Sequence, residues 1–318
     1  MKFLLFNQTL QPPCLIVMLC LMLMSTGPAQ SLDSMIAFSS DREGRLDIFV
    51  MKSDGSQQRN LTKNPTSVHI DPAWSPDGRK IAFERFGKIY VMNNADGKHL
   101  INLTPNQPGS TAPAWFPDGR KIAFAKDRDI YIMNANGESP VNLTEGPPDD
   151  KDPAWSPDGR KIAFERDWDI YIMNANGKRP IRLTFVIGFN REPAWSPNGR
   201  KIAFRSNRDG NWEIYVMNAD GTEQVQLTNT DTLPNDFPVY NRNPFWSPNS
   251  RKIGFDSNRN GNYEIYVMDA DGENPTNLTQ NPASDIGGSW VLGELAVSPK
   301  TRLLTLWGEI KTLEGEEK

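Results

Sequence analysis

The chain has 318 residues, of which 37% are hydrophobic and 23% charged, with a formal net charge of −4. This composition excludes a disordered chain. The acidic balance argues against a general nucleic-acid binder, which needs a basic face to displace counterions from phosphates.

The first thirty residues differ from the rest and are predicted to be a signal peptide, residues 1–30. Lys2 precedes an apolar run, CLIVMLCLMLM at 14–24, and small residues follow near Ala29. The alternative is an uncleaved anchor helix, although the run is short for a bilayer span. Both cysteines, Cys14 and Cys20, lie in this leader, so the mature chain has no thiol chemistry. We expect a periplasmic or secreted protein with no stable membrane insertion after cleavage.

One segment recurs along the chain after the leader. DPAWSPDGRKIAFER occupies residues 71–85 and returns unchanged at 152–166, with looser copies at 112–126, 192–206 and 243–257. Each unit ends on a Leu-Thr pair, and the spacing between units is 40 to 51 residues. Such a period indicates a repeat architecture in which neighbouring units share a core.

Each unit predicts four short strands, namely PAW, KIAF, IYVMN and the segment that ends in Leu-Thr, separated by SPDG and NADG turns. Four-stranded units of this period are typical of propeller blades. The sequence therefore predicts an all-β, six-bladed β-propeller of antiparallel blades over residues 35–308, followed by a charged C-terminal tail, 309–318.

The first unit lacks a PAW strand of its own. LAVSPKTR at 295–302 aligns its Ser-Pro and Arg with WSPDGR, so we expect this C-terminal segment to supply the inner strand of blade one. The N- and C-terminal segments would then share one blade and close the ring, which leaves no open edge.

The repeat WSPDGRKIAF, followed by IYVMNADG and a terminal Leu-Thr, resembles the WD-like propeller repeat of the TolB family over about residues 35 to 300. The resemblance implies a six-bladed propeller, exported to the periplasm, that binds proteins of the cell envelope. TolB itself carries an additional α/β domain before its propeller. Here the leader runs almost directly into blade one, so we expect a TolB-like propeller without that domain.

Three acidic residues precede Pro-Ala-Trp in their units: Asp71, Asp152 and Glu192. Ala112 and Asn243 take the equivalent places. These positions begin the inner strands and are expected to surround one mouth of the central channel. A partial carboxylate ring could hold a cation such as calcium or attract a basic peptide. The alternative is a solvated or turn-capping set, and no other metal or cofactor is expected.

Variation between units predicts a partner-binding wall. The hairpin between the second and third strands is longer in blades one, five and six, and the connections at 229–243 and 280–294 are also long. Aromatic and arginine side chains, which are enriched in protein-binding hot spots, gather in these segments. The candidate partner-binding residues are Arg42, Arg208, Trp212, Phe237, Tyr240, Arg242, Arg259 and Tyr263. The alternative is that longer hairpins merely pack against longer connections.

Catalytic constellations are scarce in the sequence. The chain has two histidines, His69 and His99, and no Gly-x-Ser-x-Gly elbow. Five tryptophans could stack on sugars, but their identical placement favours core packing: Trp74, Trp115, Trp155, Trp195 and Trp246. We therefore expect a non-enzymatic propeller that binds a protein or peptide of the cell envelope. The alternative is a carbohydrate-active or other small-molecule enzyme that uses carboxylates in the channel.

Overall fold

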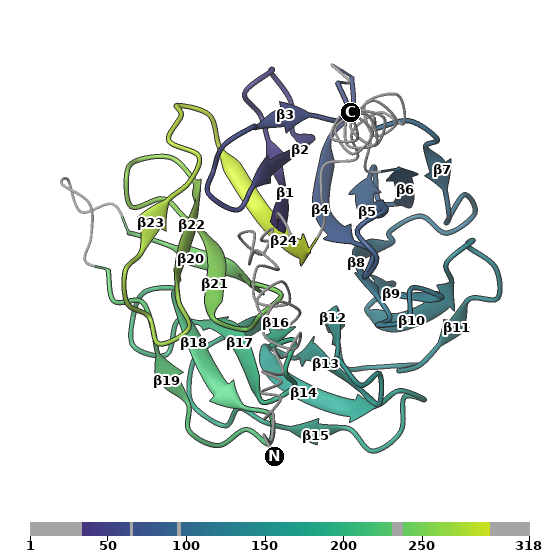
Figure 1. Cartoon of the computed structure of the whole chain (residues 1–318). Coiled ribbons are helices and arrows are strands. Elements are labelled where there is room, and N and C mark those ends of the chain that lie inside the picture. The colour runs from purple at the N-terminus through teal and green to yellow at the C-terminus, as the bar shows by residue number, and fades with distance from the viewer. Residues whose placement is uncertain (1–33, 64–65, 94–96, 231–237, 293–318) are drawn as a thin grey trace, which may run out of the picture. The chain divides into compact units, whose positions relative to one another are not determined.

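The computed structural model describes residues 34–63, 66–93, 97–230 and 238–292. These residues form six antiparallel sheets of four strands each, and none of them is helical. The sheets stand as blades around a common centre (Figure 1). The predicted six-bladed β-propeller is confirmed. The predicted signal peptide and the tail at 309–318 lie outside the described residues. Within the described residues, no helix is long and apolar enough to cross a membrane.

In each blade the strands follow one another from the inside outward, apart from the inner strand of blade one, which comes from the end of the described chain. Blade one contains β24 (Asp285–Leu292), β1 (Ser34–Ser40), β2 (Asp47–Lys52) and β3 (Arg59–Asn60); blade two contains β4 (His69–Trp74), β5 (Lys80–Arg85), β6 (Ile89–Asn93) and β7 (Ile101–Asn102). Blade three contains β8 (Thr111–Trp115), β9 (Lys121–Lys126), β10 (Asp129–Asn134) and β11 (Val141–Asn142); blade four contains β12 (Asp150–Trp155), β13 (Lys161–Arg166), β14 (Asp169–Asn174) and β15 (Ile181–Arg182). Blade five contains β16 (Asn190–Trp195), β17 (Lys201–Ser206), β18 (Glu213–Asn218) and β19 (Val225–Gln226); blade six contains β20 (Asn241–Trp246), β21 (Lys252–Ser257), β22 (Glu264–Asp269) and β23 (Thr276–Asn277).

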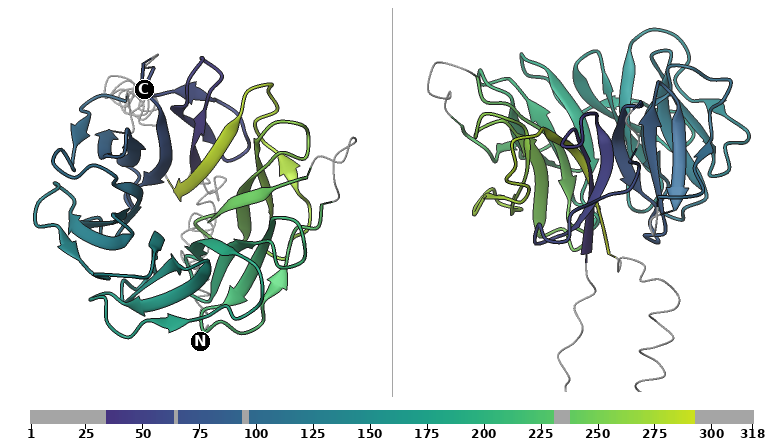
Figure 2. Two further views of the ribbon diagram at one scale, coloured as in Figure 1. Left: turned by 180° about the vertical axis from the view of Figure 1, so that it is seen from behind. Right: turned by 90° about the horizontal axis from the view of Figure 1, so that it is seen from above.

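The ring closes, as predicted, by pairing of an N-terminal with a C-terminal strand in blade one. The C-terminal strand, however, comes from a different segment than predicted. β24 pairs antiparallel with β1, and Figure 2 shows the yellow strand beside the purple one. The prediction that LAVSPKTR at 295–302 forms this strand was wrong, and that segment lies outside the described residues. DIGGSW at 285–290 matches HIDPAW at 69–74, with Trp290 at the blade tryptophan position. Two glycines replace the acid and the proline of the repeat, which hid the match, and the predicted long connection at 280–294 therefore contains a strand.

The Leu-Thr pair that ends each unit ties its outer strand to the third strand. The threonine Oγ1 accepts a hydrogen bond of 2.8–3.1 Å from the backbone N–H of an isoleucine, which is the first or second residue of the third strand. In four blades an asparagine two residues earlier accepts from the threonine N–H. The repeated Asn-Leu-Thr pattern is thus a backbone-capping device.

Aromatic pairs and tryptophans fill the space within and between blades. In every blade a buried phenylalanine of the second strand lies 5.6–6.1 Å, between ring centroids, from an aromatic of the third. The indole N–H groups of Trp115 and Trp246 donate to the backbone oxygens of Ala73 and Ala194 in the preceding blade. The blade tryptophans are largely buried, which agrees with core packing.

A glycine in the turn after the third strand lets each blade approach the one before it. Gly137 has a φ of +89°, and a Cβ there would lie 2.7 Å from the backbone oxygen of Leu103. We predict that Gly137→Ala lowers the free energy of unfolding by about 1–3 kcal/mol, because it adds both left-handed strain and a backbone clash. Urea unfolding followed by tryptophan fluorescence measures the change.

Gly261→Ala is the matched control for this variant. Gly261 has a φ of +105° with nothing within 4 Å of the added Cβ, so it carries the strain without the clash. Equal losses in the two variants would contradict a role of Gly137 in blade-to-blade contact.

Candidate functional site

Each inner strand carries a bulge close to its start, and the residue in the bulge has left-handed backbone geometry. The φ angles are +54° at Asp71, +49° at Ala112, +50° at Asp152, +54° at Glu192 and +51° at Asn243. Pairing with the second strand shifts register at the same places. A positive φ is uncommon for residues other than glycine and is held here by the surrounding sheet.

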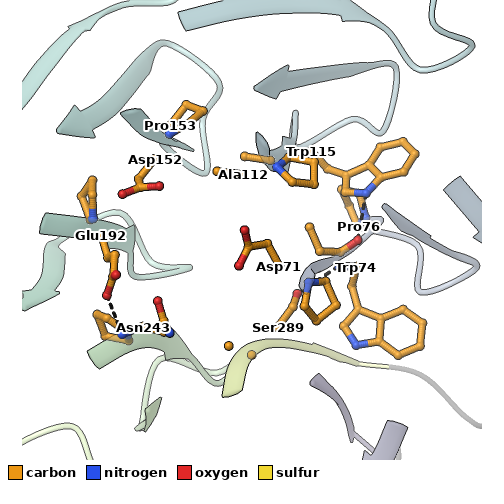
Figure 3. Close-up of a pocket in the computed structure, with 18 residues that line it drawn as sticks. Asp71, Trp74, Pro76, Ala112, Trp115, Asp152, Pro153, Glu192, Asn243 and Ser289 are labelled. Carbon is orange, nitrogen blue, oxygen red and sulfur yellow. Dashed lines mark hydrogen bonds between the residues drawn. The ribbon is translucent and has the colours of Figure 1, made fainter. Parts of the chain in front are cut away.

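The bulges bring the predicted acidic residues together around a central cavity of about 440 Å³. Figure 3 shows the carboxyl groups of Asp71, Asp152 and Glu192 pointing into it, with Trp74 and Trp115 on one wall. Ala112 and Asn243 complete the circle from their blades, as the repeat predicted. None of the described residues that line the cavity is basic, so the lining is anionic.

Confinement raises the pKa of the cavity carboxyls. The Asp71 side chain is exposed to the central cavity, but the protein around it removes bulk solvent, and this desolvation, followed by the charges of Glu84 and Asp152, raises its pKa to about 7. Burial also raises the pKa of Glu192 to about 7, although an ion pair of 2.9 Å with Arg205 opposes the rise. The Glu192 side chain is further fixed by the N–H of Asn243, which donates to its Oε2 at 2.7 Å. Near neutral pH, the cavity can therefore gain or lose protons.

A second layer of charges surrounds the cavity in blades four to six. Glu165 is buried beside Asp152, and burial followed by the Asp152 charge raises the pKa of Glu165 to about 8. Arg191 Nε lies 3.6 Å from Glu165 Oε1. In blade six, Arg242 Nε donates to Asp256 Oδ2 at 2.6 Å. The cations needed to offset these carboxylates thus stand behind the cavity wall.

The same cations stack on aromatic rings at the rim of the cavity, in a set that we name the aromatic arc: Trp168, Trp212 and Tyr263. The Arg191 guanidinium lies 3.9 Å from the Trp168 ring centroid, and the Arg242 guanidinium lies 3.7 Å from that of Tyr263. Each arc residue ends the hairpin between the second and third strands of its blade. The backbone oxygen of each arc residue accepts a hydrogen bond from the N–H of the first residue of the next inner strand. In one case Asn190 N donates to Trp168 O at 2.7 Å. The hairpins, the blade connections and the starts of the inner strands therefore share one face, here called the mouth face.

Three of the predicted partner-binding arginines are engaged inside their own blade. Arg42 makes a bidentate contact to Asp285 at 2.9 Å and lies over the Phe49 ring. Arg208 donates to Asn190 Oδ1 at 2.7 Å, and Arg259 donates to Asn241 Oδ1 at 3.0 Å. Each of these guanidinium groups binds the side chain of the first residue of an inner strand, so the three arginines stabilise the blades. A role in binding a partner stays a prediction for them.

The other predicted wall residues gather more closely. Trp212 and Tyr240 are bridged through their backbones, and Tyr263 stacks with Arg242. Phe237 lies outside the described residues. Sequence reasoning missed Trp168, Arg191 and other members of this face. Comparing the residue before each bulge position, where the units carry Asp, Glu, Asn or Ala, would have found the cations, which are Lys151, Arg191 and Arg242 in three successive blades.

The described residues contain no cluster of three or more histidine, cysteine or acidic side chains placed to hold one metal ion. Calcium binding in the cavity therefore stays a prediction.

We predict that Glu165→Gln reduces the loss of stability with rising pH. The native state keeps a proton on Glu165 up to about pH 8, whereas the unfolded chain releases it near 4.5. Between these values the native state binds more protons, so the free energy of unfolding falls as the pH rises. The variant should therefore gain stability relative to the wild type at pH 8 but not at pH 4. Chemical denaturation across this range measures the slope.

Glu138→Gln, which changes an exposed turn residue, is the control and should keep the wild-type slope. An unchanged slope in Glu165→Gln would show that Glu165 ionises alike in the native and unfolded states.

Comparisons with known proteins agree with the geometry. The TolB beta propeller domain model matches residues 165–235. A Tol-Pal system protein TolB from Desulfosudis oleivorans is 30% identical over 91 residues, which cover 26% of this chain and 20% of that protein. The chain therefore matches about a fifth of the length of this curated relative.

Solved structures extend the likeness over most of the chain. A protein assigned as TolB from Agrobacterium tumefaciens is 25% identical, with a TM-score of 0.64 over 80% of this chain and 90% of that one. TolB from Acinetobacter baumannii is 22% identical, with a TM-score of 0.67 over 82% of this chain and 67% of that one. The fold also resembles that of an oligogalacturonate lyase in complex with manganese, at 13% identity, a TM-score of 0.54, and 76% and 73% coverage of this chain and that one. In its repeat and in its fold, the chain is thus similar to the TolB β-propellers, as its sequence predicted.

Proposed function

We propose that this protein is an exported, non-enzymatic β-propeller of the cell envelope that binds a protein or peptide segment at its mouth face. The observation that carries the proposal is the anionic central cavity together with the aromatic arc, whose partners Arg191 and Arg242 directly precede the lining residues Glu192 and Asn243 in the chain. Aromatic and arginine side chains beside a concave site are what protein-binding hot spots contain. The similarity to TolB supports a location in the periplasm.

A rigid scaffold under the site supports binding rather than catalysis. The three acidic groups lie in bulges of the inner strands β4, β12 and β16, so their positions are fixed before a ligand arrives. Fixed positions reduce the entropy lost on binding. A side chain with a positive charge would also meet Asp71 and Asp152 without displacing a basic neighbour from the cavity lining.

The alternative, an enzyme that uses carboxylates, has one observation in its favour. Asp152 and Glu165 interact closely and both have a raised pKa, as acid catalysts often do. Asp152 lines the cavity, but Glu165 is buried outside its lining. The Asp152–Glu165 pair therefore offers the cavity only one of its two carboxyls.

In-cell photocrosslinking tests the proposal. Trp212, half-buried in the aromatic arc, is replaced by a photoreactive residue, and Lys98, near a turn of the opposite face, is replaced in a control. We predict a protein adduct from position 212 and none from position 98. Asp71→Asn, which keeps a residue tolerant of positive φ, should weaken the adduct by removing negative charge from the cavity.

A folded, exported protein that gives no adduct at position 212 would contradict a docking role. An adduct of equal strength with and without Asp71→Asn would show that the partner does not bind through the charge of the cavity.

A further inference from the structure

An exposed apolar surface lies on the mouth face where blade four connects to blade five. The connection from β15 to β16 exposes Phe185 by 73%, Val186 by 46%, Ile187 by 96% and Phe189 by 42%. Trp168, at the end of the neighbouring hairpin, is 41% exposed and lies 5.1 Å from Phe189 between ring centroids. We name these five side chains the apolar connection.

The composition of this connection departs from that of its counterparts. After Leu-Thr, blades one to three continue with polar or proline-rich segments, namely KNPTS at 63–67, PNQPG at 105–109 and EGPPD at 145–149. Blade four continues with FVIGF at 185–189. Four large apolar residues in a solvent-facing connection cost solubility, so they indicate a contact with another molecule.

The apolar connection is held in place and does not fold back to bury itself. Phe189 N donates to Asn207 Oδ1 at 2.7 Å, and Asn207 N donates to Phe189 O at 3.2 Å. Gly188, with a φ of +124°, approaches so closely that an added Cβ would lie 2.9 Å from the Arg208 Cα. The backbone at Gly188 and Phe189 is thus fixed, which favours binding at this end of the apolar connection because little order has to be gained.

The apolar connection is continuous with the rim of the cavity. Phe189 contacts two rings of the aromatic arc, tilted against Trp168 at 5.1 Å and stacked on Trp212 at 6.3 Å between ring centroids. Arg191 covers the Trp168 ring and also reaches Glu165. A ligand that leaves the cavity on this side therefore passes directly onto the apolar connection.

The exposed area of the apolar connection limits which partner it can bind. Five side chains at these exposures offer on the order of 500 Å², whereas a stable interface covers about 800 Å² on each partner. The apolar connection alone is therefore too small to hold a second copy of the chain. A short polypeptide segment, which covers less area than a folded partner, fits the apolar connection and the nearby cavity mouth better than a second copy does.

We propose that the apolar connection is the second anchor point for the same polypeptide segment that occupies the mouth. The proposal rests on the function proposed above and specifies the partner: a segment with a large apolar side chain for the apolar connection and, a few residues away, a lysine or arginine for the anionic cavity. Charge complementarity supports the second element, because three carboxyl groups and no basic group line the cavity among the described residues.

The test selects binders from a phage-displayed random dodecapeptide library on the purified full-length protein. Three variants are compared with the wild type: Phe185→Ser with Ile187→Ser, Asp71→Asn, and a control, Ile101→Ser with Val141→Ser, which changes exposed apolar residues on the outer strands β7 and β11. Thermal melting confirms that each variant folds. Fluorescence anisotropy then measures the affinity of one selected peptide for each variant.

We expect wild-type peptides to combine a large apolar residue with a basic one. Loss of Phe185 and Ile187 should remove the apolar enrichment and weaken the peptide by about tenfold or more. Asp71→Asn should reduce the basic enrichment, and the control should change neither. Peptides that lose affinity for Asp71→Asn but bind Phe185→Ser with Ile187→Ser as tightly as the wild type would overturn this inference but leave mouth binding in place. Peptides that neither change weakens would overturn both. Failure to select any peptide would overturn the proposed function itself, and the inference with it.

Two further measurements can assign another occupant. Self-association seen by sedimentation, or binding to phosphatidylglycerol vesicles, would overturn the proposal if Phe185→Ser with Ile187→Ser abolished it and the control did not.

Discussion

The strained bulge in each inner strand is the constraint on which the site depends. A residue with φ near +50° just inside the strand turns its side chain from the blade into the central cavity. Left-handed geometry costs about 1–3 kcal/mol at a residue other than glycine. The cost recurs in five blades, where Asp71, Asp152 and Glu192 are three of the residues that carry it. Blade packing that offsets this cost therefore also fixes the spacing of the carboxyl groups.

The bulge also sets the position of the charges around those carboxyl groups. The residue before the bulge still pairs regularly with the second strand, so Lys151 faces Glu165 and Arg242 faces Asp256. Each of these cations contacts an aromatic ring of the rim, Trp168 or Tyr263. Ion pairing and stacking thus connect the cavity with the aromatic arc on one side. On the blade-two side, Ile70 faces Glu84 and supplies no cation, so the field in the cavity is uneven.

The repeat itself made much of the fold predictable. The Leu-Thr pairs, the aromatic pairs and the turn glycines recur because each blade must meet its neighbour through the same contacts, and these contacts leave a clear period in the sequence. The acidic positions were also found in this way. The closing strand was missed because Gly287 needs no acid to adopt its φ of +59°, and Gly288 stands where other blades have proline.

The sequence by itself determined the blade count, the strand order within blades and the convergence of Asp71, Asp152 and Glu192, because these follow from a local period. Only the tertiary structure decided which side chains remain exposed for binding a partner. It places Arg42, Arg208 and Arg259 in internal contacts and leaves the 185–189 connection exposed. It also explains two glycines that look unrelated in sequence: a Cβ at Gly254 or at Gly288 would lie 2.2 or 2.1 Å from the Phe245 ring. Departures from the repeat, such as Gly254, Gly288 and the 185–189 connection, carry no period, so the sequence alone cannot assign the contacts that they make.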